Sequence, residues 1–354
     1  MPPKFKHHFK IKNWLLKTMK HPFFGIIVLG MILLFIFPLS GYTLRGAIGQ
    51  SLTFTIVALG FSILLGFSGL ASLGTAGFAG VGAYSLGLLT NDLGFPFIVS
   101  LIVTLLFAII IGVIVGFVSL RIEGMYLAII TLGLSSILNQ VFISMFGDGT
   151  YVLSRFELFG MPINVPMTGM LIVLILVIMM MAVSNVSKSP TGRAMIAMKN
   201  SESAAQAMGI SVLKYRLLAF IIATVLAALG GMLYMAFERN MSPSTSSQPG
   251  VFNLAYSLNI LAAVVIGGSR SIFGIFFASL FVYRFDVIVN ALFRGVEING
   301  NWILILSGVI IILMIMFYPG GFSRLALDAK FKFKKFFAKQ KLKWKEYRYG
   351  KDPK

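Results

Sequence analysis

The chain is 354 residues long, and its composition is that of a membrane protein: 58% of its residues are hydrophobic and only 12% are charged. An average soluble domain has roughly a quarter of its residues charged, so an ordinary soluble enzyme is excluded. The absence of cysteine excludes disulfides, thiolate metal sites and cysteine nucleophiles. All three histidines, His7, His8 and His21, precede the first apolar run. We therefore expect no catalytic residue, no metal site and no proton relay built on histidine or cysteine inside the membrane.

The net charge of +19 is concentrated in three stretches. Residues 1–20 contain six Lys, residues 188–216 contain five Lys or Arg, and residues 323–354 contain twelve. Basic residues that flank apolar segments are typical of the cytoplasmic loops and tails of membrane proteins. We expect all three stretches to face the cytoplasm, and we predict no nucleic-acid partner in spite of the high charge.

Ten apolar runs follow one another along the chain, most of them close to the roughly 20 residues that a membrane-spanning helix needs. Six runs precede the basic 188–216 stretch and four follow it, so both termini and this stretch fall on one side of the membrane. The sequence predicts an all-α, polytopic helical bundle with about ten transmembrane helices and cytoplasmic N and C termini. The predicted spans are residues 22–39, 47–66, 72–89, 95–120, 125–146, 167–185, 215–237, 254–268, 272–292 and 302–318.

These spans divide the chain into three parts. Residues 1–21 form a basic cytoplasmic segment, residues 22–322 a transmembrane domain, and residues 323–354 a basic cytoplasmic tail. The longest cytoplasmic loop inside the membrane domain is predicted at residues 186–214. The loops at residues 147–166 and 239–250 are predicted to face outward, because they lie on the side opposite to the basic stretches.

The predicted span at residues 72–89 is rich in small residues. Small faces let helix backbones approach closely in lipid, so tight packing is one interpretation. A glycine-broken helix that lines a translocation pathway is the other. The small residues recur every four positions on two neighbouring helical faces: Ser72, Ala76 and Gly80 on one, Ala79, Ala83 and Gly87 on the other.

Polar residues inside the predicted spans are candidates for a pathway or for hydrogen bonds between helices. Arg284 and Asp286 are the charges well inside a predicted span, where each costs about 2.5 to 3.5 kcal/mol on insertion scales. We expect that span to end near Tyr283, which places both charges at the outer interface; a functional pair with other helices is the alternative. The uncharged candidates are Gln50, Ser51, Thr53, Asn139, Gln140, Tyr256, Ser257 and Asn259.

The loop at residues 186–214 is predicted to form two short helices. Ser189 can cap a helix that begins with Pro190. Asn200 or Ser201 offers a second start, Glu202 is favourably placed against its N-terminal dipole, and Gly209 offers a stop. These helices are expected to present small apolar faces to another protein, or to lie on the membrane surface. The faces comprise Met195 and Met198 on the first helix and Ala204, Ala205 and Met208 on the second.

The tail from residue 330 to residue 354 interleaves lysines with aromatic residues. This combination suits a helix that lies on anionic lipid. Single-stranded nucleic acid is bound by the same residue types, but attachment to a membrane domain favours lipid. We therefore expect anionic lipid to be the partner of the tail.

The 186–214 loop also resembles a known element. Gly192-Arg193-Ala194, followed by Ala204-Ala205-x-x-x-Gly209-Ile210, is similar to the cytoplasmic coupling loop of bacterial ABC-importer permeases, which seats in a cleft of the ATPase subunit. The common form of that loop is Glu-Ala-Ala-x-x-x-Gly, whereas this chain has Ser203 at the position of that Glu and Glu202 one position earlier. The resemblance implies an ATPase-coupling role for Gly192, Arg193, Ala194, Glu202, Ala204, Ala205 and Gly209.

Three further stretches resemble the M-type permease subunit of the Liv transporters for branched-chain amino acids. Residues 121–133 read RIEGMYLAIITLG, which is similar to the family's Arg-Leu-x-Gly-x-Tyr-Leu-Ala-Ile-x-Thr-Leu-Gly segment. Residues 264–269, with Gly274 after them, resemble a Gly-Gly turn between two late spans. Residues 318–322 resemble the Pro-x-Gly-hydrophobic ending of the last span. The resemblance covers roughly residues 41–322.

The resemblance implies a permease subunit of an ATP-binding cassette importer for leucine, isoleucine and valine in the bacterial cytoplasmic membrane. It also implies a second, related permease, two ATPase subunits and an extracytoplasmic substrate-binding protein. The chain itself is then no enzyme and binds no cofactor, because ATP is bound by the partner subunits. Two alternatives remain open: a urea or short-chain amide permease of the same kind, and an ion-coupled secondary transporter, which would need intramembrane carboxylates such as Asp286.

Overall fold

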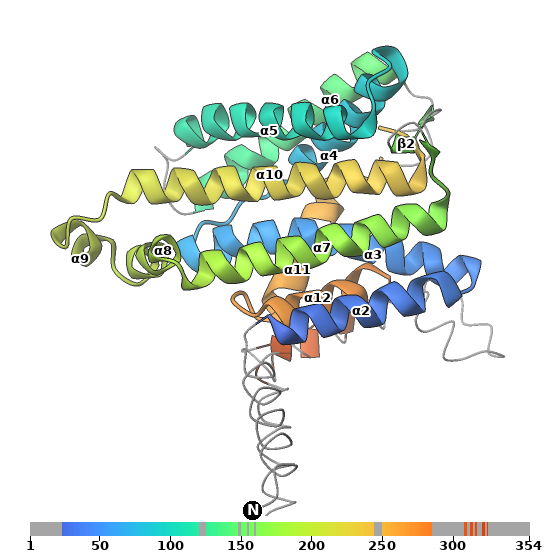
Figure 1. The fold of residues 1–354 in the computed structure, drawn as a ribbon. Helices are drawn as coiled ribbons and strands as arrows, with labels where there is room; N and C mark the ends of the chain where they lie inside the picture. The colour runs from blue at the N-terminus through green and yellow to red at the C-terminus, as the bar shows by residue number, and fades with distance from the viewer. Residues whose placement is uncertain are drawn as a thin grey trace, which may run out of the picture.

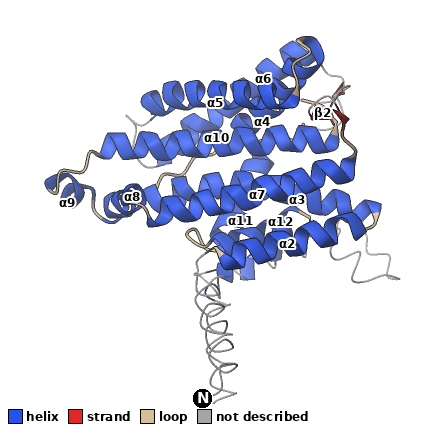
Figure 2. Ribbon diagram, viewed as in Figure 1, coloured by secondary structure: helices blue, strands red, loops and turns tan. Residues whose placement is uncertain are grey.

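The computed structural model describes residues 23–284, except 120–124, 148–149, 154–155, 159–160 and 244–249, and eight positions beyond them: 308, 309, 312, 313, 316, 321, 322 and 324. The described part is a bundle of long helices that run side by side (Figures 1 and 2). Most of the tenth predicted span, the basic segment 1–21, the 121–124 part of the Liv-like stretch and most of the basic tail lie outside the described residues.

Nine helices of the described part correspond to the first nine predicted spans. Two of them continue into a π-helical turn, α3 into η1 (Ile63–Ser68) and α4 into η2 (Leu88–Asp92). By length and composition, α3 with η1, α5, α6, α7 and α10 could each cross a membrane, and α2, α11 and α12 are apolar but shorter. The protein is therefore an all-α, multi-pass membrane protein. The nine helices are α2 (Phe24–Leu39), α3 (Tyr42–Ser62), α4 (Thr75–Gly87), α5 (Phe97–Ser119), α6 (Met125–Phe146), α7 (Val165–Lys188), α10 (Val212–Glu238), α11 (Leu254–Gly267) and α12 (Ile272–Tyr283).

Two small antiparallel strand pairs lie in the loops predicted to face outward. β1 (Tyr151–Val152) pairs with β4 (Asn240–Met241), and β2 (Glu157–Leu158) pairs with β3 (Met161–Pro162). The first pair joins the 147–166 loop to the 239–250 loop. The sequence did not predict these strands, which are only two residues long. They do place the two loops at the same end of the bundle, in agreement with their predicted common side.

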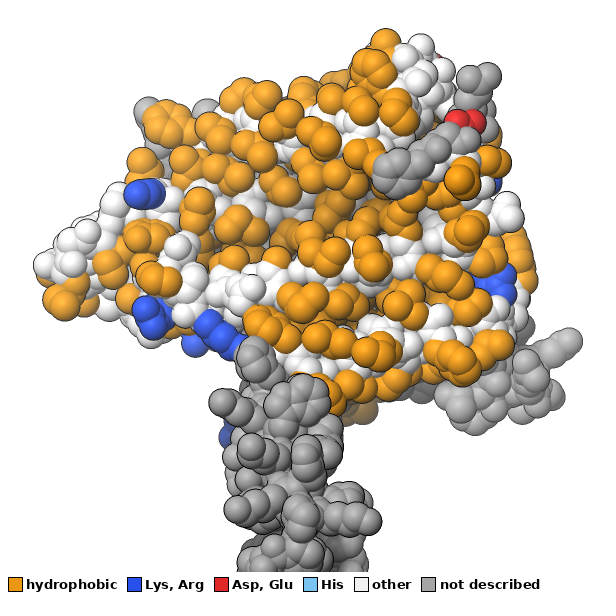
Figure 3. All heavy atoms as spheres, viewed as in Figure 1, with side chains coloured by type: hydrophobic (Ala, Val, Ile, Leu, Met, Phe, Trp, Pro, Cys, Tyr) orange, Lys and Arg blue, Asp and Glu red, His pale blue; other side chains and the backbone are white. Residues whose placement is uncertain are grey.

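The helices differ in how much of their surface this chain covers. In α3, 94% of the most apolar window is buried inside the bundle, but the share is 22% in α5 and 17% in α6. Helix α3 is thus the centre of the fold, whereas α5 and α6 leave broad faces for lipid or for other subunits. Apolar side chains cover most of the face in Figure 3, and the Lys and Arg side chains visible there lie toward the two ends of the helices.

Close backbone contact holds α4 against α10. A Cβ atom on Gly82 would lie 1.9 Å from the carbonyl oxygen of Ala228, and one on Gly231 would lie 1.8 Å from that of Ala79. Only glycine allows such an approach. The tight-packing interpretation of the small residues in the 72–89 stretch is therefore confirmed. This stretch forms a short helix, separated from η1 by a non-helical segment that starts at Gly69, where φ is +77°.

Candidate functional site

The 186–214 loop forms the two short helices that the sequence predicts, α8 (Pro190–Asn200) and α9 (Glu202–Ala207), which project from one end of the bundle (Figure 1). The hydroxyl of Ser189 accepts a hydrogen bond from the N–H of Gly192 at 3.1 Å, and that of Ser201 accepts one from Ala204 at 3.3 Å. Gly209 has φ +79°, and its N–H donates to the carbonyl of Gln206. Both predicted caps and the predicted stop are confirmed.

The predicted apolar faces of these helices are largely turned inward. Met195 is fully buried, and Met198 and Ala205 are each 3% exposed. Ala205 and Met198 form a small apolar cluster with Val212. The prediction that Met195, Met198 and Ala205 face a partner is therefore wrong. They pack against the chain's own helices and hold the loop on the bundle. Met208, in contrast, is 83% exposed.

The remaining residues of the predicted coupling set also include both exposed residues and residues that pack against or bond to this chain. Arg193, Ala204 and Gly209 are exposed. Gly192 is buried, since a Cβ there would lie 2.2 Å from a carbonyl oxygen of the preceding helix α7. Glu202 forms an ion pair of 2.6 Å with Arg216 at the start of α10. The structure thus brings the set together in one loop, with its exposed members on α8, on α9 and just after α9.

Lys199 connects this loop to the end of the central helix. Its Nζ donates to the carbonyl oxygens of Leu65 at 2.9 Å and Gly66 at 3.1 Å, and Nε of Arg270 also donates to the Gly66 oxygen at 3.1 Å. Carbonyls at a helix C-terminus lack intrahelical partners and attract cations. Burial, followed by the nearby charge of Arg270, lowers the pKa of Lys199. The sequence analysis did not predict this contact, because nothing in the sequence shows that Lys199 and Arg270 lie near Gly66.

The glycine-rich stretches that carried the family resemblance meet at the same end. A Cβ on Gly274 would lie 1.9 Å from the carbonyl oxygen of Gly267, and one on Gly321 would lie 2.2 Å from that of Ile266. The Gly-Gly turn between α11 and α12 is therefore tightly packed. Because Arg270 lies in this turn, the 186–214 loop, the end of α3 and the turn form one connected group.

The pathway candidates on α3 are buried inside the bundle, and only one reaches another helix. Ser51 and Thr53 donate hydrogen bonds to carbonyls of their own helix. Tyr256 packs its ring against Phe54, and the hydroxyl of Ser257 accepts a hydrogen bond from the N–H of Ala76 at the start of α4. Tyr256 and Ser257 thus join α11 to α3 and α4, whereas the hydroxyls of Ser51 and Thr53 bond within α3. Gln50 is different and belongs to the opposite end of the molecule.

The other pathway candidates lie on α6 and α11, at positions that the described part of the chain leaves partly or fully exposed. Asn139 on α6 lines a cavity of about 80 Å³ together with Ser136 and Asn253. Gln140 and Asn259 are exposed on α6 and α11. Polar side chains at membrane depth are costly in contact with lipid and usually face protein or water. The exposed polar positions on α6 and α11 are therefore suited to contact with a partner subunit or with a water-filled passage.

A polar cavity of about 620 Å³ lies at the end opposite to Lys199. Gln50 stands in its wall: its Nε2 donates to Oε1 of Glu238, and its Oε1 accepts a hydrogen bond of 2.5 Å from Nε of Arg284. Helix α12 ends at Tyr283, as predicted, so Arg284 lies at a helix end and also contacts another helix. Asp286 lies outside the described residues. Sequence reasoning missed Glu238, the last residue of α10.

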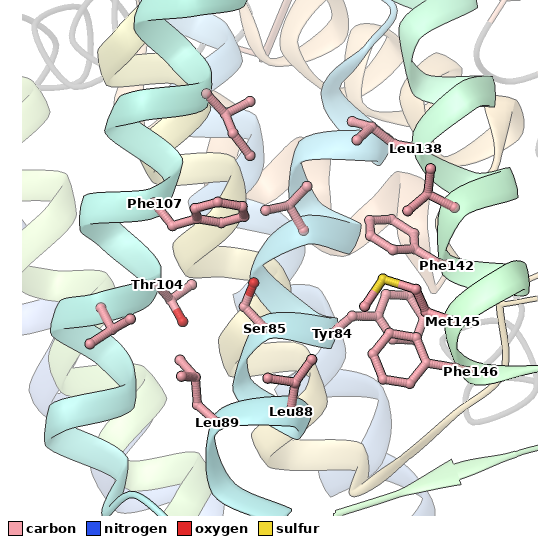
Figure 4. Close-up of a pocket in the computed structure, with 14 residues that line it drawn as sticks. Tyr84, Ser85, Leu88, Leu89, Thr104, Phe107, Leu138, Phe142, Met145 and Phe146 are labelled. Atoms are coloured by element: carbon pink, nitrogen blue, oxygen red, sulfur yellow. The ribbon is translucent and has the colours of Figure 1, made fainter. Parts of the chain in front are cut away.

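A second cavity, of about 390 Å³, opens between α4, α5 and α6 and is apolar (Figure 4). Phe107, Phe142 and Phe146 are among the side chains that line it, and Ser85 and Thr104 are its polar side-chain contributors besides Tyr84. A cavity without charged groups cannot neutralise the ends of an amino acid. It is therefore a poor candidate for the polar part of such a substrate.

Comparison with known proteins gives the family. The profile of the family described as "Branched-chain amino acid transport system / permease component" matches residues 43–315. The high-affinity branched-chain amino acid transport system permease protein LivM of Escherichia coli K12 is 28% identical over 327 residues, which cover 84% of this chain and 74% of that protein. The protein of the same name from Salmonella typhimurium is 28% identical over 295 residues, covering 75% and 67%.

Among solved structures, PsaBC from Streptococcus pneumoniae in complex with Fab has a TM-score of 0.39 and 16% identity, over 82% of this chain and 95% of that one. This likeness is too weak to support any statement about the fold. The family profile, in contrast, spans well over half of the sequence and includes the central helices and the loop of α8 and α9. The chain therefore belongs to the family of branched-chain amino acid transport system permease components.

Proposed function

We propose that the chain is the transmembrane subunit of an ATP-binding cassette importer that carries leucine, isoleucine and valine across the bacterial cytoplasmic membrane. Its two LivM relatives are named as branched-chain amino acid permeases, which supports the substrate class. The observation that carries the ATP-driven mechanism is the loop of α8 and α9, which is packed firmly on the bundle but leaves its tip, around Met208, exposed.

In this mechanism the exposed tip docks in an ATPase subunit, and nucleotide-dependent movement of that subunit displaces α8 and α9 together. The buried cluster of Met198, Ala205 and Val212 makes the loop move as a unit. Lys199 passes the displacement to the end of α3, and Arg270 extends it to the turn before α12. Because α3 is buried from Gly49 to its end at Ser62, it carries the motion as a rigid element toward Gln50.

The uncovered surfaces leave room for the proposed partners. A second, related permease would cover the polar face of α6 and α11, so that the passage runs between the two chains. An extracytoplasmic binding protein would dock near the strand pairs β1–β4 and β2–β3. ATP would be bound and hydrolysed by two ATPase subunits, and this chain would need no cofactor and perform no catalysis.

The Lys199→Met substitution tests this proposal, since it keeps an unbranched side chain of similar length and removes the charged hydrogen bonds. Such bonds contribute about 1.5 to 3 kcal/mol each, so we expect leucine uptake per ATP hydrolysed to fall about tenfold or more, while ATPase subunits stay bound. The ratio of leucine taken up to ATP hydrolysed is obtained by measuring both rates with the purified complete complex.

Lys214→Met is the matched control, because Lys214 is exposed on the same loop; its ratio should equal that of the wild type. An unchanged ratio in Lys199→Met would show that this contact transmits nothing. A chain that takes up leucine without any associated ATPase would contradict the proposed function itself.

A further inference from the structure

We propose that the cavity around Gln50, Glu238 and Arg284 is a binding site for the charged ends of a zwitterionic amino acid, at the end of the bundle predicted to face outward. This inference rests on the proposed function and names the place where the permease recognises its substrate. The cavity lies between the starts of α3 and α7 and the ends of α10 and α12, so four helices separated in sequence build it.

The charges of the cavity are held in place by the chain itself. Arg45 donates to the carbonyl oxygens of Pro38 and Ser40 at 2.9 and 2.8 Å. Arg239, the residue at the C-terminal end of α10 with φ +61°, donates to a carbonyl of the 147–166 loop. Among the described residues that line the cavity, three are thus arginines and one, Glu238, is a carboxylate. The positive excess attracts an anion, and anchoring to backbone groups means that little side-chain entropy is lost when it binds.

Gln50 sets the spacing between the two opposite charges. Its side chain is 8% exposed and joins Glu238 through its amide nitrogen and Arg284 through its amide oxygen. The carboxylate and the guanidinium are therefore held on either side of one amide group, next to open space. In an α-amino acid the carboxylate and the ammonium are likewise separated by a few bonds.

The chemistry of these groups defines what the cavity would select. A guanidinium is the preferred partner of a carboxylate, through charge-assisted and often bidentate hydrogen bonds. Glu238 would accept hydrogen bonds from the ammonium group. Phe237, Val165 and Ala47 add apolar surface to the same lining, which suits an aliphatic side chain. A neutral molecule such as urea can form hydrogen bonds but no ion pair with either charge, so the cavity favours amino acids over the urea and amide alternatives.

Protection of a cysteine introduced into this chain, which contains none of its own, tests this site in the complete complex when labelling of this subunit is measured. Thr43 lines the cavity, is exposed and takes no part in the Gln50 network. In Thr43→Cys, we expect leucine to slow modification by a cationic methanethiosulfonate reagent. Leucinol, which lacks the carboxylate, 4-methylpentanoate, which lacks the ammonium, and urea should each protect at least tenfold more weakly.

Glu238→Gln is then combined with Thr43→Cys. The substitution keeps a side-chain oxygen that can accept a hydrogen bond from Gln50 and removes the negative charge. The leucine concentration for half-protection should rise at least tenfold, which is about 1.4 kcal/mol. Arg284→Lys keeps the positive charge but loses the planar guanidinium that can bind a carboxylate with two hydrogen bonds. It should raise the leucine concentration for half-protection by a smaller factor. Glu157→Gln, at an exposed carboxylate in β2 outside the cavity, is the matched control and should behave as Thr43→Cys alone.

The outcomes separate this inference from the proposed function. A complex that takes up leucine but shows no leucine protection, or equal protection by 4-methylpentanoate, overturns the binding site and leaves the function standing. A fall in thermal stability of Glu238→Gln with an unchanged half-protection concentration assigns the network a structural role only, which also overturns the site. A complex that takes up no branched-chain amino acid refutes the proposed function.

Discussion

We expect the Met208→Asp substitution to abolish leucine uptake while leaving the membrane domain folded. Met208 follows α9 and is 83% exposed, so a polar side chain there should change the stability of this chain by no more than about 0.5 kcal/mol. In a groove of an ATPase subunit, the same carboxylate would be buried without a partner, at a cost of several kcal/mol. Binding should weaken at least a hundredfold. Copurification of the ATPase subunits and leucine uptake measure the two effects.

The matched control is Ser203→Glu, which adds the same charge on α9, in the same loop as Met208. Ser203 is exposed, and the resembling permeases carry Glu at this position, so binding and uptake should be retained. Ala205→Asp is not a clean test, because Ala205 is buried beside Met198 and Val212 and the charge would unfold the loop itself. Normal ATPase binding in Met208→Asp, or equal losses in Ser203→Glu, would show that the tip is not the docking surface.

We expect Gly82→Ala to destabilise the membrane domain strongly. The added Cβ would lie 1.9 Å from the carbonyl oxygen of Ala228, and because the opposing atom is backbone, α4 and α10 must move apart. Overpacking of this kind costs about 1 to 3 kcal/mol and occasionally more. The midpoint of thermal unfolding of the purified chain in detergent should fall, with less monodisperse protein recovered.

Gly133→Ala is the control for this change, because nothing lies within 4 Å of a Cβ placed on Gly133 in α6. Alanine is the better helix former by about 1 kcal/mol, so this variant should be at least as stable as the wild type. Equal stability of Gly82→Ala and Gly133→Ala would mean that α4 and α10 are not in the close contact described.

The sequence predicted those features that depend on local signals. Apolar runs gave the helices of the described part to within a few residues, because length and hydrophobicity alone decide which segments can span a bilayer. Ser189, Ser201 and Gly209 marked the ends of α8 and α9 correctly, since capping uses side chains and backbone conformations a few residues apart.

The contacts that define the candidate sites could not be predicted in this way, because they join residues far apart in the chain. Lys199 and Leu65 are separated by 134 positions, Gln50 and Glu238 by 188, and Gln50 and Arg284 by 234. The burial of Met198 was missed for a related reason. An apolar stripe on a short helix predicts that this side of the helix is buried. It does not show whether the stripe packs against the same chain or against a partner.

Leucine uptake by the complete complex in proteoliposomes, with ATP supplied and with ion gradients abolished by ionophores, tests the central claim most directly. The account predicts that leucine accumulates in the lumen when ATP is enclosed there and the face carrying α8 and α9 is turned inward. Ionophores should leave the rate unchanged, and omission of either ATP or the ATPase subunits should stop uptake. Leucine uptake that continues without ATP and stops when a proton or sodium gradient is dissipated would contradict the account and indicate an ion-coupled carrier.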